Sequence, residues 1–188
     1  RYVIGFDSAS STYWTRDERT LFRERVTGDR LETDTLLRGV PIIQVLLDKE
    51  GNAWLGSTGN GLYRYYAKDF DKIGTSMRRV MAVTKDKVVN TWMGGEGLVR
   101  LQKDKQVRYP LPNGDDDGVR AITVSPRGDV WVGTYSGLGK YDAAKDKFTW
   151  FNREHGLSSA YVTSMAYDDQ DRLWIGTIGG GLNRYDGK

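Results

Sequence analysis

The stretch Leu173-Trp174-Ile175-Gly176-Thr177 decides the fold, because its core recurs three more times along the chain. The other copies are Ala53-Trp54-Leu55-Gly56, Thr91-Trp92-Met93-Gly94 and Val130-Trp131-Val132-Gly133. The four tryptophans stand 38, 39 and 43 residues apart. Each core is followed by a loop of small residues and then by Gly-Leu, with Arg or Lys two positions after the leucine. A fixed period of about 40 residues indicates a repeat architecture, in which each unit is one supersecondary structure.

Within one unit the residues favour short strands joined by tight turns. An apolar segment, such as 42–47 or 119–124, precedes the tryptophan, and a polar turn such as 125–129 or 168–171 separates the two. Polar turns between β-rich segments are typical of hairpins. A glycine loop then leads to the Gly-Leu strand, and a stretch such as 147–151, which contains Trp150, has the composition of an outer strand. Four short strands per repeat predict the blade of a β-propeller.

The glycine two positions after each tryptophan fits this prediction. Blades taper toward a central axis, so we expect a side chain at this position to collide with a neighbouring strand. A degenerate copy of the unit stands at the N-terminus, where Trp14 lies 40 residues before Trp54 and Leu21-Phe22-Arg23 takes the place of the Gly-Leu strand. A sandwich of irregular hairpins is the alternative fold, but it gives no reason for a fixed tryptophan period.

We therefore expect an all-β chain of about five propeller blades. The expected divisions are a degenerate first blade at 1–40, blades at 41–75, 76–118 and 119–160, and an incomplete last blade at 161–188. Two arrangements fit this count, a five-bladed ring with one three-stranded blade or an arc of a larger propeller. We expect the arc, because the chain begins directly on strand-like residues.

Composition excludes several classes of function. The 188 residues carry 28 basic and 25 acidic side chains, a net charge of +3 that is too mixed for a nucleic-acid footprint. The chain has no cysteine, so disulfides and thiolate metal sites are excluded. No apolar run approaches the roughly 20 residues that a membrane helix needs, so we expect no membrane insertion by this segment.

Residues 173–186 resemble the two-component regulator propeller repeat, which reads Trp-Ile/Val-Gly-Thr, a glycine loop and then Gly-Leu-x-Arg-Tyr-Asp. Residues 130–142 follow it nearly as closely, whereas 81–101 departs, with Glu96 in its loop and no glycine in its turn. The resemblance covers about residues 40 to 188. It implies the extracytoplasmic, periplasmic sensor region of a hybrid histidine kinase or a membrane-bound diguanylate cyclase, and not an enzyme. In the kinase group many cues are breakdown products of polysaccharides.

Binding residues are expected where two kinds of loop meet at one face of a propeller. These are the loops between second and third strands and the loops that lead into each new blade. Mixed aromatic, amide and charged side chains there suit a sugar or peptide ligand. The candidates are Asn60, Arg78, Arg79, Glu96, Arg120, Tyr135 and Tyr161. Expected partners are an oligosaccharide or other small ligand, and neighbouring blades or a protomer of the parent protein.

The sequence offers little for catalysis. His155 is the only histidine, and we interpret it as an exposed loop residue, so no catalytic residue, metal ligand or cofactor is expected. The segment 113–118 carries clustered carboxylates of the kind that bind Ca²⁺, but without the ordered spacing of such a site, and we interpret it as a solvated loop. Two other functions stay open: an enzyme like the streptogramin lyases, whose repeat is similar, and a protein-binding scaffold.

Overall fold

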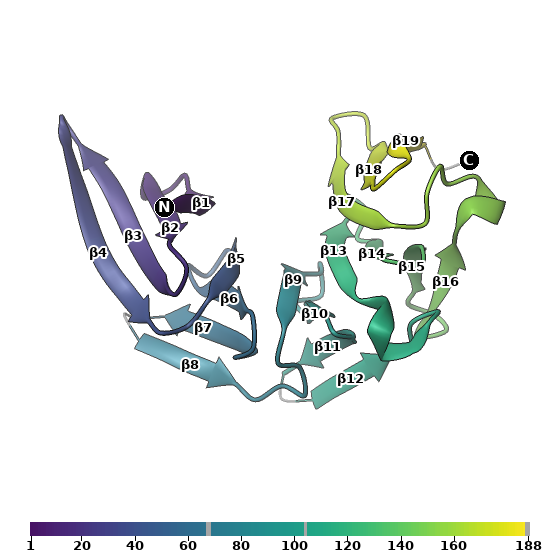
Figure 1. The fold of residues 1–188 in the computed structure, drawn as a ribbon, viewed down its shortest axis with the longest axis horizontal. Helices are drawn as coiled ribbons and strands as arrows, with labels where there is room; N and C mark the ends of the chain where they lie inside the picture. The colour runs from purple at the N-terminus through teal and green to yellow at the C-terminus, as the bar shows by residue number, and fades with distance from the viewer. Residues whose placement is uncertain (67–68, 104, 187–188) are drawn as a thin grey trace. The chain divides into compact units, whose positions relative to one another are not determined.

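The computed structural model describes residues 1–66, 69–103 and 105–186, and within them the regular elements are strands and two short 3-10 turns. No helix in these ranges is long and apolar enough to cross a membrane. The chain forms two compact units, Arg1–Val83 and Thr84–Lys188, and the boundary falls inside strand β9 (Val80–Lys85). In every sheet, strands that follow one another along the chain are neighbours (Figure 1). The prediction of an all-β chain built from short antiparallel strands is confirmed.

The first unit contains two four-stranded sheets of consecutive hairpins, β1-β2-β3-β4 and β5-β6-β7-β8. Their strands are β1 (Tyr2–Asp7), β2 (Thr12–Arg16), β3 (Thr20–Thr27), β4 (Arg30–Arg38), β5 (Ile42–Leu47), β6 (Ala53–Ser57), β7 (Leu62–Tyr66) and β8 (Asp69–Ile73). Trp14 on β2 pairs with Arg23 on β3, as Trp54 on β6 pairs with Arg64 on β7. The degenerate N-terminal copy therefore forms a full sheet with the same cross-strand pair.

The remaining sheets have the orders β12-β11-β10-β9, β13-β14-β15-β16 and β17-β18-β19. Their further strands are β10 (Thr91–Gly95), β11 (Leu98–Gln102), β12 (Lys105–Tyr109), β13 (Val119–Val124), β14 (Val130–Thr134), β15 (Leu138–Asp142), β16 (Lys147–Phe151), β17 (Val162–Tyr167), β18 (Leu173–Thr177) and β19 (Gly181–Tyr185). The 3-10 turns are η1 (Gly114–Asp117) and η2 (Arg153–His155). Trp150 lies on the outer strand β16, as predicted. The division of the chain into blade domains stays a prediction.

The turn between the first two strands of a repeat contains a residue with positive φ. It is Gly51 (φ 83°), Val89 (φ 69°), Gly128 (φ 101°) or Asp171 (φ 58°) in successive repeats. Glycine enters this left-handed region freely, whereas a β-branched residue is strained there. Two of these turns lack glycine, and the one with the β-branched Val89 at positive φ therefore carries backbone strain.

The glycines two positions after Trp92 and Trp131 make room for the next sheet, as expected, whereas a Cβ at Gly176 would meet Ser164 of its own sheet. A Cβ at Gly133 would lie 2.5 Å from Cγ1 of Val162, the first residue of β17. A Cβ at Gly94 would overlap Val119, the first residue of β13, still more closely. Overlap of this size cannot be relieved by a small side-chain movement. Adjacent sheets of the second unit therefore approach each other through glycine on one side and valine on the other.

An ion-pair and hydrogen-bond cluster joins two sheets of the second unit. The hydroxyls of Tyr109 and Tyr141 each donate to Oδ1 of Asp146 at 2.5 Å, and Nη1 of Arg100 lies 3.0 Å from the same oxygen. The hydrogen bonds from Tyr109 and then from Tyr141 hold the pKa of Asp146 below its ordinary value. Both rings also contact the fully buried Trp92, so the cluster covers one side of the core.

Candidate functional site

The two kinds of loop predicted to carry binding residues are joined by backbone hydrogen bonds. In each case the residue after the second strand donates its N–H to the carbonyl of a residue just before the first strand of the same sheet. The bonds are Thr58 to Pro41 (3.0 Å), Tyr135 to Asp117 (3.1 Å) and Ile178 to Tyr161 (2.9 Å). The loops between second and third strands and the loops that lead into each blade therefore meet at one end of the strands in each of these sheets.

In the first unit the structure brings together the segments that carry Asn60, Arg78 and Arg79. The N–H of Gly61 donates to the carbonyl of Arg78 at 2.8 Å, and Thr58 forms a β-bridge with Arg79. Both arginines are exposed, and Asn60 is half-buried between the glycines of its loop. An amide and two cations thus share one edge of this unit.

In the second unit Tyr135, Tyr161 and Arg120 form a cluster, which we call the tyrosine cluster. The two rings meet edge to face, with centroids 4.6 Å apart and an interplanar angle of 67°. The guanidinium of Arg120 lies 5.9 Å from the centroid of the Tyr135 ring. Gly118 (φ 60°) permits this placement, because a Cβ there would lie 2.7 Å from the ring of Tyr135. Three of the residues predicted from the sequence therefore form one contiguous group.

The surroundings of the tyrosine cluster are polar and partly shielded from water. Burial raises the pKa of Tyr161, and the neighbouring Tyr135 hydroxyl raises it further, so Tyr161 remains a hydrogen-bond donor at neutral pH. Asp117, whose carbonyl binds the backbone of Tyr135, is only 2% exposed. Neither of its carboxylate oxygens has a hydrogen-bond partner among the described residues. The interpretation of segment 113–118 as a solvated loop is therefore wrong for Asp117, which η1 places in the interior.

Glu96 and His155 lie in other surroundings. Glu96 is in the tight loop between β10 and β11, where its carbonyl accepts from Nη2 of Arg108 at 3.0 Å. His155 is the exposed last residue of η2, with Nδ1 2.8 Å from Oδ1 of Asn152 and its ring edge-on to Phe151. Within the part of the chain that the structure describes, no group of three or more His, Asp or Glu side chains is placed to hold a metal.

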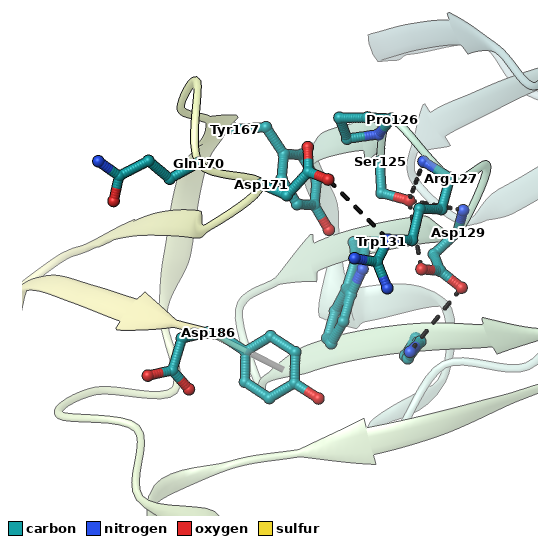
Figure 2. Close-up of a pocket in the computed structure, with 11 residues that line it drawn as sticks. Ser125, Pro126, Arg127, Asp129, Trp131, Tyr167, Gln170, Asp171 and Asp186 are labelled. Carbon is teal, nitrogen blue, oxygen red and sulfur yellow. Dashed lines mark hydrogen bonds and ion pairs between the residues drawn. The ribbon is translucent and has the colours of Figure 1, made fainter. Parts of the chain in front are cut away.

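A polar cavity of about 250 Å³ lies at the opposite end of β14 from Tyr135. Its lining contains none of the residues that the sequence predicts as binding residues. Its lining includes Asp129, Trp131, Tyr167 and Asp171, drawn in Figure 2. It forms where the hairpin turn 125–129 faces the corresponding turn of the next sheet. The sequence contains a signal for this cavity: Ser125 stands six positions before its tryptophan, where the other three strong repeats have aspartate.

Residues 156–179 match the family model described as two component regulator propeller, which confirms the predicted resemblance over this segment. No curated protein matches the chain. The chain is similar to the solved extracellular domain of a B. thetaiotaomicron protein described as a hybrid two component system, with a TM-score of 0.81 and 19% identity. That alignment covers 99% of this chain and 28% of that one, so this chain spans less than a third of its relative.

Two further similarities come from proteins with other roles. Virginiamycin B lyase from Staphylococcus aureus aligns with a TM-score of 0.73 and 15% identity, over 98% of this chain and 69% of that one. PorZ of Porphyromonas gingivalis, described as a surface component of the type-IX secretion system, aligns with a TM-score of 0.72 and 16% identity, over 96% and 31%. Identities this low show the fold alone. The chain is built of propeller blades, as its sequence predicts.

Proposed function

We propose that this chain is the ligand-sensing part of an extracytoplasmic propeller in a membrane signalling protein, and that it is not an enzyme. The tyrosine cluster is the observation that carries the proposal. Two aromatic rings from separate loops and a guanidinium from the start of β13 provide stacking surface and hydrogen-bond donors in one place. The match to the regulator propeller family and the likeness to the extracellular domain of a hybrid two component system support the same assignment.

A carbohydrate is the ligand class that we propose for the tyrosine cluster. Aromatic rings pack against the apolar face of a sugar, while hydroxyl and guanidinium groups bind its oxygens. Tyr135 is 37% exposed, so its ring is available to a ligand while its backbone is held by Asp117. The arrangement therefore combines a fixed backbone with an accessible ring.

Isothermal titration calorimetry of the purified chain with a panel of plant and host oligosaccharides tests the proposal. Tyr135→Ala and Tyr161→Ala should each weaken binding about tenfold, the equivalent of about 1.4 kcal/mol. Tyr66→Ala is the matched control, because Tyr66 is 39% exposed and lies in the first unit. Equal affinity of all three variants would refute binding at the tyrosine cluster.

The signalling role and its alternatives need separate experiments. Reading the gene on both sides of this segment tests for a membrane span and a kinase or cyclase domain, and their absence would contradict the sensor proposal. Conversion of a streptogramin B substrate, lost in His155→Ala, would establish the lyase alternative instead. Capture of a defined protein partner that survives both tyrosine substitutions would favour the scaffold alternative.

A further inference from the structure

A hydrogen bond between a tryptophan and an aspartate recurs in three of the four strong repeats. The indole Nε1–H of the tryptophan donates to Oδ2 of an aspartate six residues earlier. The pairs are Trp54 with Asp48 (2.8 Å), Trp92 with Asp86 (2.8 Å) and Trp174 with Asp168 (2.7 Å). The other carboxylate oxygen accepts from backbone N–H groups of the hairpin turn, for example from Val88 (3.1 Å) and Asn90 (2.9 Å) to Asp86. One carboxylate thus closes the turn and satisfies the buried indole.

The repeat around Trp131 lacks this acceptor. Its counterpart of the aspartate is Ser125, whose single Oγ accepts from the backbone of Arg127 (3.2 Å) and Asp129 (2.9 Å) and so closes the turn alone. Trp131 is 1% exposed, and its Nε1 has no hydrogen-bond partner among the described residues. A buried donor without an acceptor is costly, so something must offset it or complete it.

In this turn the carboxylate stands at position 129 instead of position 125, and it lines the cavity. Asp129 stands where the other repeats have Asn52, Asn90 and Arg172, and it accepts from Oγ of Ser125 at 3.2 Å. Figure 2 shows Asp129 on one side of the cavity, Asp171 and Asp186 on the other, and Trp131 between them. Compared with the other repeats, this repeat therefore has no carboxylate beside the indole N–H and has an additional carboxylate that faces the cavity.

The charges of the cavity are loosely paired. Nζ of Lys140 lies 3.8 Å from Asp129, and Nε of Arg127 lies 3.9 Å from Asp171, both close to the limit for an ion pair. With Asp186 the lining carries three carboxylates against two cations, which disfavours an anionic ligand. Carboxylates at such distances retain unused acceptor capacity.

A hydroxyl group fits these requirements, because it accepts a hydrogen bond from an indole N–H and donates one to a carboxylate at the same time. The half-buried rings of Tyr167 and Tyr185 supply apolar surface. Burial raises the pKa of Tyr167 to about 12, so its hydroxyl, which lies beside Trp131 and Ser125, stays protonated and able to donate. The indole nitrogen is covered by neighbouring atoms, so a ligand hydroxyl that bonds to it has to displace the Tyr167 hydroxyl, which lies beside it.

We propose that this cavity is a second binding site, which takes a small neutral polyhydroxylated ligand such as a sugar unit or a polyol. One ligand hydroxyl occupies the place that aspartate takes in the other repeats, between Trp131 and Asp129. The site does not depend on the tyrosine cluster, because the two lie at opposite ends of β14.

The indole N–H signals of the ¹⁵N-labelled chain test this proposal directly, with glucose and myo-inositol titrated into the millimolar range as probes. Trp131→Phe assigns the Trp131 signal. We expect this signal to shift saturably with at least one probe, while the Trp92 signal, already bonded to Asp86, stays in place. No saturable shift with either probe, or a response to acetate or glycine betaine alone, would overturn the proposal.

The double variant Ser125→Asp/Asp129→Asn restores the pattern of the other repeats and provides the matched control. Its indole signal should move on substitution and then no longer respond to the probes, and thermal denaturation verifies that it is folded. Asp171→Asn, which tolerates the positive φ at this position, should weaken the response about tenfold in an otherwise unchanged turn. An undiminished response in both variants would place the ligand elsewhere, as would a response lost in Tyr135→Ala.

Discussion

Replacing Asp86 by serine gives the Trp92 repeat the residue that the Trp131 repeat carries at Ser125. The structure shows what is kept and what is lost. A serine hydroxyl can still accept from the backbone N–H groups of the turn, as Ser125 does. The bonds from Nε1 of Trp92 and Nδ2 of Asn90 to Oδ2 of Asp86, both 2.8 Å, have no replacement.

The expected cost follows from these two bonds. Trp92 is 0% exposed and Asn90 is 5% exposed, so neither donor can turn to water. A buried hydrogen bond to a charged acceptor contributes about 1.5–3 kcal/mol, and a neutral amide left partly satisfied costs about 1 kcal/mol. We therefore expect Asp86→Ser to lower the free energy of unfolding by about 2–4 kcal/mol.

Equilibrium unfolding in urea, followed by tryptophan fluorescence and near-ultraviolet circular dichroism, measures this difference. The midpoint should fall while the m value stays constant, since the surface exposed on unfolding is unchanged. Asp86→Asn keeps one oxygen and should lie between the wild type and Asp86→Ser. A loss smaller than about 0.5 kcal/mol for Asp86→Ser would refute the reasoning, because the indole bond would then contribute nothing measurable.

Three further changes test other features of the fold. Val89→Gly should raise the free energy of unfolding by about 1 kcal/mol, since it relieves a β-branched residue at φ 69°, and a lower midpoint in urea would contradict this. Gly133→Ala should lower the melting temperature, at a cost of about 1–3 kcal/mol, because its Cβ would overlap Val162, whereas Gly74→Ala, with open space around it, should change little. The pKa of Asp146 is lowered in the folded state, so its stabilisation is present above the ordinary aspartate pKa and is lost as the pH falls below about 4. Asp146→Asn should therefore be less stable than the wild type at neutral pH and closer to it in acid, and an equal difference at both pH values would refute the role of the charge.

The repeat itself was sufficient to predict most of the fold. The tryptophan period located the second strands, and the glycine two positions later correctly indicated a close neighbour, Val162 in the case of Gly133. These features are visible in the sequence because every copy faces the same steric problem. The sequence does not predict the strain at Val89, because it shows a turn without glycine but not which residue takes the positive φ.

The candidate site was only partly predictable. Loop position identified Tyr135 and Tyr161, and the structure adds their mutual contact and that with Arg120. The cavity beside Trp131 was missed because the turn 125–129 was interpreted by its shape alone. What distinguishes this turn is a difference between repeats, and a comparison of the four turns position by position would have revealed it. Residues shared by all repeats predict the fold, whereas a residue that differs in one repeat, such as Ser125, indicates a candidate binding site.

The contact between Gly133 and Val162 has a consequence for how such chains change in length. Two successive junctions of the second unit have the same form, with Gly94 against Val119 and Gly133 against Val162. A duplicated or deleted repeat therefore meets a complementary neighbour at once, without any compensating substitution. Gain or loss of whole blades becomes a single genetic event that leaves the junction intact, so blade number can drift far more freely than the residues that form the junction.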